Sequence, residues 1–109
     1  MKASGRKGDS REAKAQPKTY LLRLFVAGDE PNSKEARENL KHICRVHLKD
    51  DCQVQIIDVF EGFEEALKSN VLVTPTLIVD APAPPVTIVG NLSDTQKVLS
   101  ALRITGAQR

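Results

Sequence analysis

The sequence predicts one α/β domain whose elements follow the order β-α-β-α-β-β-α. Short runs of β-branched and aliphatic residues alternate with segments in which apolar residues recur at helical spacing, and turn or capping residues separate them. The chain has 109 residues, 40% of them hydrophobic, which is enough for one compact core and too little for two. We expect a domain over residues 18–109, preceded by a leader over residues 1–17.

The composition of the leader is typical of a disordered segment. It carries five Lys and Arg residues against two acidic residues, a net charge of +3. Since the formal net charge of the whole chain is +2, the remaining 92 residues have a net charge of −1. It lacks the apolar run of a secretory signal or a transmembrane segment, which predicts a cytoplasmic protein that does not associate with membranes. A nearly neutral domain also argues against a specific nucleic-acid partner.

The first predicted strand, residues 19–27, has apolar residues on both faces. One face holds Tyr20, Leu22, Leu24 and Val26, and the other holds Leu21, Arg23 and Phe25. Such a strand belongs inside a sheet that is covered on both sides. A turn over residues 28–31 ends the strand, and Asn32 or Ser33 is expected to cap the helix that follows. With Asn32 as the cap, Glu35 occupies the reciprocal capping position.

The next elements complete a parallel unit. The buried stripe of the first helix is predicted to comprise Ala36, Leu40, Ile43, Cys44 and His47. The second strand, residues 53–59, has apolar residues on both faces, so neither face is expected to be exposed to solvent. A strand, a helix and a strand in this order predict a parallel, right-handed crossover. Residues 61–70 are predicted to form a helix that ends at Asn70, with Phe63, Ala66 and Leu67 facing inward.

The C-terminal part predicts two antiparallel strands and a helix. Residues 76–79 and 86–89 are short β-branched runs joined by an Ala/Pro-rich segment, which is too stiff for a two-residue hairpin. Residues 93–96 have the pattern of a capping box, and the helix after them is predicted to bury Val98, Leu99, Ala101 and Leu102. The complete order is that of a thioredoxin-like sheet packed between helices.

Dithiol chemistry is not expected from this chain. Thioredoxin-like folds usually place Cys-x-x-Cys where the first strand meets the first helix, because the helix N-terminus lowers the thiol pKa. Residues 27–33 contain no cysteine here, and Asp29 and Glu30 would repel a thiolate. Thr74-Pro75 resembles the cis-proline entry to the third thioredoxin strand, but without a thiol this feature predicts architecture and not catalysis.

Other reactive side chains have ordinary structural explanations. Cys44 and Cys52, the only cysteines, have the spacing of neither a redox pair nor a zinc knuckle. His42 and His47 would lie about 140° apart on a helix, which disfavours a metal site. The carboxylates Asp58, Asp80 and Asp94 fall at the ends of predicted elements, where caps and turns account for them. We therefore expect a binding protein with no catalytic residue, metal or cofactor.

Three segments together resemble one family. They are residues 18–28, 73–77 and 90–94, which read KTYLLRLFVAG, VTPTL and GNLSD. Their order and joint spacing are similar to those of KaiB, a small circadian-clock protein family, and the resemblance runs from about residue 18 to residue 103. It implies docking on a KaiC-like ATPase ring, with KaiA or a clock-associated histidine kinase as further partners.

The resemblance also implies two alternative folds. KaiB-like proteins exchange a tetrameric ground fold for a monomeric thioredoxin-like fold, and the segment that rearranges corresponds to residues 60–109. We expect the thioredoxin-like monomer to dominate here, with the tetramer as the alternative. Ala101 stands where the family often has Gly, which favours helix by about 1 kcal/mol. Arg103 replaces an acidic residue, and a cation near a helix C-terminus adds about 0.3–1 kcal/mol.

The resemblance assigns two groups of candidate residues. The candidates for partner contact are Tyr20, Arg23 and Lys68, which could equally be packing or solvated residues. The candidates for determining the fold are Pro75, Pro82, Pro84, Gly90, Ser93, Asp94, Ala101 and Arg103. Basic contact positions of the family appear here as Glu35, Gln55, Val79 and Thr87, and the acidic tail is absent. Because lost charge alters partner choice, we expect a divergent adaptor for clock or stress signalling that works without KaiA.

Two other functions remain open from the sequence. The first is a sensory or interaction domain in a histidine kinase pathway without a circadian role, because the N-terminal domains of clock-associated kinases share this fold. A redox or metal enzyme is the second, and the missing cysteine at the helix entry argues against it.

Overall fold

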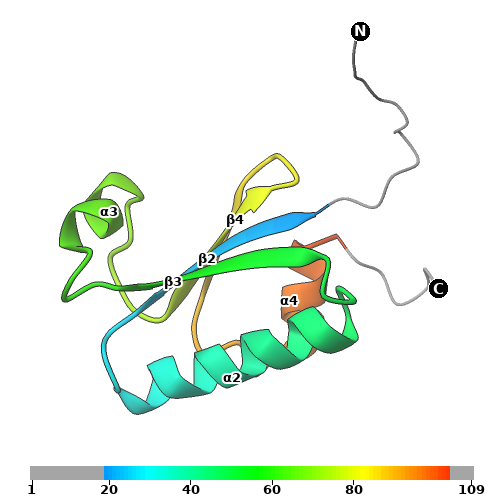
Figure 1. Ribbon diagram of the computed structural model, residues 1–109, viewed down its shortest axis with the longest axis horizontal. Coiled ribbons are helices and arrows are strands. Elements are labelled where there is room, and N and C mark those ends of the chain that lie inside the picture. The colour runs from blue at the N-terminus through cyan, green and yellow to red at the C-terminus, as the bar shows by residue number, and fades with distance from the viewer. Residues whose placement is uncertain (1–18, 104–109) are drawn as a thin grey trace, which may run out of the picture.

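Four strands form one mixed sheet in the order β3-β2-β4-β5 (Figure 1). The computed structural model describes residues 19–103. β2 (Tyr20–Val26) pairs in parallel with β3 (Cys52–Asp58) and antiparallel with β4 (Thr76–Ala81), which pairs antiparallel with β5 (Val86–Val89). The predicted element order and the central place of the first strand are therefore confirmed. The disorder expected of residues 1–17 concerns residues outside the described range.

The three helices within residues 19–103 lie on two sides of the sheet. In Figure 1, α2 (Pro31–Val46) and α4 (Thr95–Ala101) lie on one face, and α3 (Phe63–Lys68) lies beyond the opposite face. The larger core joins one face of β2 and β4 to α2 and α4, and its centre is formed by Leu22, Leu24, Leu40, Ile43, Leu77 and Val98. The smaller core beneath α3 consists of Phe25, Ile57, Ala66 and Ile78. Successive side chains of β2 thus pack alternately into the two cores, as its two apolar faces predict.

The helix caps differ from the predicted ones. Glu30 caps α2, where its side chain accepts a 2.9 Å hydrogen bond from Ser33 N, and Pro31 occupies the first helical position. Ser33 is buried, and its hydroxyl accepts a hydrogen bond from Ala27 N. In α4 the cap is Asp94, which accepts from Lys97 N at 3.1 Å, so the capping box does not begin at Ser93. The Glu30 side chain therefore caps the helix N-terminus, the role that was expected of Asn32 or Ser33.

Two predicted faces are more exposed than expected. β3 has one neighbour, β2, so it is an edge strand, and Val54 and Ile56 are 42% and 44% exposed. In α3 only Ala66 is buried, whereas Phe63 and Leu67 face solvent. Apolar composition predicted strand and helix correctly but not their coverage, because β3 lies at the edge of the sheet and α3 has only six residues. His47 is half-buried, and Leu48 lies in the core in its place.

The proline-rich segments have defined geometry. The Thr74–Pro75, Ala81–Pro82 and Ala83–Pro84 peptide bonds are cis. Pro75 directly precedes β4, as the thioredoxin-like pattern predicts, and the other two lie between β4 and β5. Among residues 19–103 no helix is long and apolar enough to cross a membrane. The cytoplasmic location stays a prediction.

Candidate partner-binding surface

Five large apolar side chains near α3 are exposed to solvent. We name them the α3 patch: Phe60, Phe63, Leu67, Leu72 and Val73. Leu72 is 89% exposed and Phe60 is 76% exposed. The patch borders a groove of about 450 Å³, whose floor includes Ala66 and Val71. A contiguous apolar surface of this kind marks an interaction site, because a monomer gains nothing by leaving it in water.

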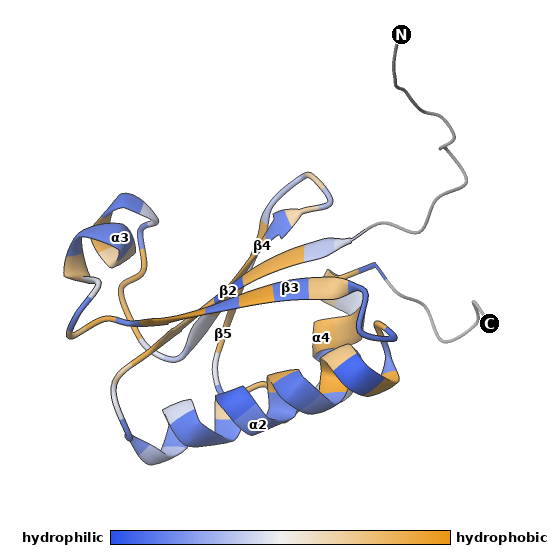
Figure 2. Ribbon diagram, in the orientation of Figure 1, coloured by the Kyte–Doolittle hydropathy of each residue, from blue (hydrophilic) through white to orange (hydrophobic). Residues whose placement is uncertain are grey.

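Local sequence explains why the patch points outward. Phe63 and Leu67 are four residues apart on α3 and therefore share a face, while the small side chain of Ala66 packs on the sheet. Figure 2 shows hydrophobic and hydrophilic residues side by side around this short helix, in contrast to the largely hydrophilic ribbon of α2. With apolar residues on both of its faces, α3 cannot bury them all.

The turn after β3 fixes Phe60 beside the start of α2. Asp58 Oδ1 accepts a hydrogen bond from Phe60 N at 2.9 Å and one from Gly28 N at 3.4 Å. Gly28 has a φ of 53°, and a Cβ there would meet the Phe60 ring at 3.6 Å. An aromatic ring therefore lies against the strand–helix junction at which thioredoxin-like enzymes carry their thiols. Asp58 has the turn-forming role that its position predicted.

Arg23 is a structural clamp in this fold. Its Nε and Nη2 donate to Asp80 Oδ2 and Oδ1 at 2.6 and 3.0 Å, and its Nη1 donates to Glu65 Oε2 and Ser69 Oγ at 2.6 and 2.8 Å. The guanidinium also lies 5.4 Å from the centre of the Phe25 ring. These contacts join β2, β4 and α3. Arg23 therefore holds α3, and with it the patch, on the sheet, and its guanidinium is not free for a partner.

Tyr20 and Lys68 lie on different parts of the molecule. The Tyr20 hydroxyl is 3.5 Å from the Leu102 carbonyl oxygen at the end of α4, on the face opposite α3. Burial raises the pKa of Tyr20 above its usual value; nearby Arg103 lowers it and Asp51 raises it, with smaller effects. Lys68 is exposed in the last turn of α3, beside the patch. Of the three predicted contact residues, the structure thus brings Arg23 and Lys68 to the α3 side and leaves Tyr20 apart.

Three of the eight residues expected to determine the fold, Gly90, Ser93 and Asp94, lie between β5 and α4. Gly90 has a φ of 119°, and Leu92, which is buried in the larger core, has a φ of 66°. A bulky residue in the left-handed region costs about 1–2 kcal/mol, so its burial must offset that strain. Ser93 N donates to Asn91 Oδ1, and Asp94 caps the helix. Leu92 belongs to the segment 90–94 that carries the family resemblance, but it was not among the residues expected to determine the fold, because the sequence does not predict its positive φ.

Ala101 and Arg103, the two residues expected to favour the helix, differ in backbone conformation at the end of α4. Ala101 is the last helical residue and is half-buried. Arg103 follows the C-cap Leu102 with a φ of 62°, and its N–H donates to Ser100 O at 3.0 Å. This position favours Gly on steric grounds, which opposes the gain from a cation near the helix C-terminus. Ala101 is therefore the clearer of the two helix-favouring features.

The cysteines and histidines lie away from the patch. Cys44 is buried near the end of α2 and Cys52 begins β3. Residues 27–33, the junction of β2 and α2, contain no cysteine. The rings of His42 and His47 are 6.3 Å apart, edge to face. Within the described range, 19–103, no group of three or more His, Cys, Asp or Glu side chains is placed to hold a metal ion.

The fold defines a thioredoxin-like domain. Mitochondrial thioredoxin 3 from Saccharomyces cerevisiae superposes with a TM-score of 0.64 at 18% identity, over 79% of each chain. The N-terminal domain of SasA from Synechococcus elongatus superposes with a TM-score of 0.66 at 24% identity, over 91% of this chain and 97% of that domain. At these identities the likeness concerns the fold alone.

Sequence comparison then gives the family. The KaiB domain model matches residues 23–104. The circadian clock protein KaiB3 of Synechocystis sp. is 42% identical over 84 residues, which cover 77% of this chain and 82% of that protein. The chain belongs to the KaiB family of circadian clock proteins, as the three sequence segments indicated.

Proposed function

We propose that this protein is a non-catalytic adaptor that binds a KaiC-like ATPase ring and modulates clock or stress signalling through that contact. The observation that carries the proposal is the α3 patch, a group of five exposed apolar side chains on a chain of the KaiB family. A cytoplasmic ATPase of that class is the partner that the family resemblance implies.

The chemistry of the patch suits a protein partner. Its two Phe side chains offer large, rigid apolar area, and aromatic residues, Phe included, are enriched in the cores of protein interfaces. Charged residues of α3, including Glu64 and Lys68, surround them and supply the polar rim that interfaces usually have. Lys68 is the predicted contact residue that fits this surface. Tyr20 fits it poorly because it lies at the far end of β2.

The thioredoxin-like form is the binding form in this proposal. The clamp from Arg23 to Asp80 and Glu65 fixes α3 to the sheet, so the five patch residues are presented together without rearrangement. Preorganisation of this kind lowers the entropic cost of association. We propose that the free protein is mainly a monomer in this form. Engagement of KaiA is not part of the proposal, because Glu35 and Gln55 stand where the family has basic contacts.

Binding to a purified KaiC-like ATPase ring tests the proposal. Leu72→Asp places a charge at the most exposed patch position and should weaken binding at least about ten-fold, since a desolvated anchor is typically worth 2 kcal/mol or more. The matched control is Val89→Asp, on β5, where an exposed valine lies outside the patch. Equal affinities of the two variants, or no binding by the native protein, would overturn the proposal.

A competition experiment separates this function from a role in a histidine kinase pathway. The thioredoxin-like domain of a clock-associated kinase should compete with this protein for the ATPase ring if both are adaptors for it. Direct binding to a histidine kinase with no binding to the ring would favour the alternative function.

A further inference from the structure

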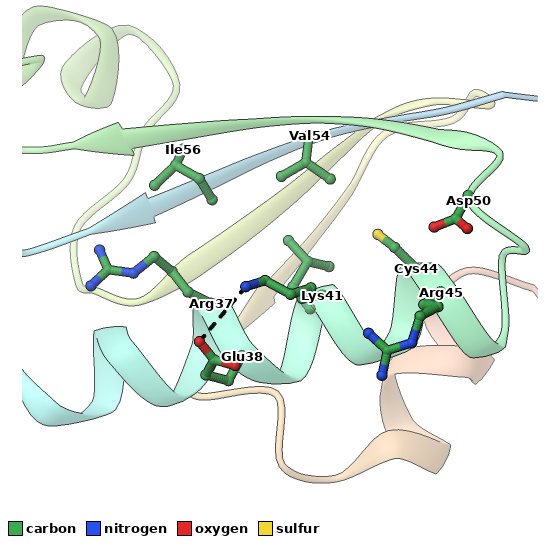
Figure 3. Close-up of a pocket in the computed structure, with 9 residues that line it drawn as sticks. Arg37, Glu38, Lys41, Cys44, Arg45, Asp50, Val54 and Ile56 are labelled. Atoms are coloured by element: carbon green, nitrogen blue, oxygen red, sulfur yellow. Dashed lines mark ion pairs between the residues drawn. The ribbon is translucent and has the colours of Figure 1, made fainter.

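A second groove lies on the opposite face, between α2 and the edge strand β3. Val54 and Ile56 project from β3 toward the helix, and Cys44 projects from α2 toward the strand (Figure 3). Leu40 completes the apolar wall, and the cavity volume is about 470 Å³. No residue lines both this groove and the groove of the α3 patch. The exposure of Val54 and Ile56 is therefore a separate feature of the molecule.

Basic side chains occupy the helical side of this groove. Arg37, Lys41 and Arg45 are spaced four residues apart on α2, so they lie along one side of the helix. Figure 3 shows Arg37 at the end where Ile56 lies, Lys41 next to it along the helix with an ion pair to Glu38, and Asp50 at the opposite end. Glu38 also lines this end, so two cations stand there against one carboxylate, and the walls of the groove are apolar.

The two cations at that end are poorly neutralised. Arg37 Nη2 lies 3.8 Å from Asp29 Oδ1, whose side chain is almost fully exposed, and Lys41 Nζ lies 3.9 Å from Glu38 Oε2. Exposed pairs at this distance contribute little, so both cations remain available to an anion. Within residues 19–103 no ion pair is formed by Arg45.

We infer that this groove binds a small amphipathic anion, such as a carboxylate with a short alkyl chain. Arg37 and Lys41 would hold the carboxylate, and the chain would cover Ile56, Val54 and Cys44 and extend away from the cationic end. The groove has the volume of a small-molecule site, for which about 300–1,000 Å³ is usual. The span from Arg37 to Arg45 is about 12 Å along the helix, which suits a chain of medium length.

Charge and size argue against other occupants. The leader, residues 1–17, carries a net charge of +3 and would be repelled by the basic side of the groove. An acidic protein segment shares the required charge but would extend well beyond a groove of this length. This inference goes beyond the proposed ATPase contact and does not depend on it, because the two surfaces lie on opposite faces of the sheet.

Titration with sodium octanoate, followed by amide NMR of the full chain, tests the inference. We expect saturable shift changes at residues 37–45 and 54–56, and weaker changes of the same kind with 1-octanol. Octylammonium, which has the opposite charge, should bind worst. Shift changes confined to the α3 patch, or equal binding of all three probes, would overturn the inference.

Matched variants locate the site. Lys41→Glu should weaken octanoate binding roughly three- to ten-fold, as expected for loss and reversal of a charge contact, whereas Lys41→Arg should retain it. Lys34→Glu is the control, because this exposed lysine is on the same helix but outside the groove. Val54→Asp should abolish binding, with Val89→Asp as its control on the other edge strand. A peptide of alternating Glu and Val that binds this groove more tightly than octanoate would overturn the assignment to a small molecule.

Discussion

Arg23 and Asp80 form a bidentate ion pair between the adjacent strands β2 and β4. Their atoms meet at 2.6 Å (Nε to Oδ2) and 3.0 Å (Nη2 to Oδ1). The β2–β4 register shifts between Leu21 and Leu22, which pair with Ala81 and Val79, so Asp80 is an extra residue on β4. Such a bulge redirects a side chain, and here the carboxylate that it redirects receives the guanidinium of Arg23.

The first prediction concerns this clamp. Arg23→Met should lower the free energy of unfolding by about 1–3 kcal/mol, because it removes charge-assisted hydrogen bonds and leaves Asp80 and Ser69 without their donor. Urea unfolding measures this change. Hydrogen exchange of α3 should also rise more than that of α2, because Arg23 bonds to α3 through Glu65 and Ser69.

Two variants control for this prediction. Arg45→Met removes an exposed arginine of α2 and should change stability by less than about 0.5 kcal/mol. Arg23→Lys keeps the charge but loses the planar fork, so it should recover part of the stability. The clamp would be wrongly assigned if Arg23→Met and Arg45→Met were equally stable.

The order of the elements was predictable because apolar periodicity is local. The alternation over residues 19–27 and the helical stripe from Ala36 to Cys44 identify β2 and α2 from neighbouring residues alone. Strand order is not local: the apolar run of β3 predicted two covered faces, but the edge position of the strand leaves Val54 and Ile56 exposed. Six residues of α3 cannot cover the apolar side chains around it.

The candidate surface was less predictable than the fold. Arg23 was identified as a contact residue, but its role depends on a bulge and on Glu65, which lies 42 residues further along the chain. The sequence does hold a signal for the patch, since Leu72 and Val73 fall in a loop between predicted elements and Phe60 precedes a helix without belonging to its stripe. Apolar residues in such positions have no expected core partner.

Tyr20 gives the second prediction, on pH dependence. Burial raises its pKa, so the folded state retains the phenol proton at a pH where the unfolded state loses it. The stability from neutral Tyr20 is present below the ordinary value of 10.0 and is lost as the pH rises through the folded-state pKa. Tyr20 is the single tyrosine and the chain has no tryptophan, so phenolate absorbance reports this group alone.

The expected titration has a clear control. The absorbance midpoint should lie above 10.0 in the native protein and should fall to the ordinary range in concentrated urea. Tyr20→Phe should make stability less sensitive to alkaline pH. A native midpoint at or below the value in urea would contradict the burial of the phenol against the end of α4.

The third prediction concerns thiol reactivity. Burial raises the pKa of the Cys44 thiol, and a neighbouring Cys52 contributes in the same direction, so Cys44 stays protonated and shielded near neutral pH. A thiol reagent should therefore react with Cys52 first and with Cys44 at least about ten-fold more slowly. Cys52→Ser should remove the fast phase, and Cys44→Ser should leave it. Equal rates for the two thiols would show that the end of α2 opens readily.

The last prediction tests whether Ala101 favours the thioredoxin-like form. Ala101→Gly should weaken α4 by up to about 1 kcal/mol, since Gly has a lower helix propensity. That energy corresponds to roughly a five-fold change in the balance between two folds. We expect smaller helical NMR shifts over Thr95–Ala101 and a larger tetramer fraction by light scattering. Asn70→Gly is the control, because Asn70 already has a φ of 60° and lies outside α4. If both variants kept full helical shifts and a monomeric mass, Ala101 would not decide the fold, and the strained link at Leu92 would be the next position to change.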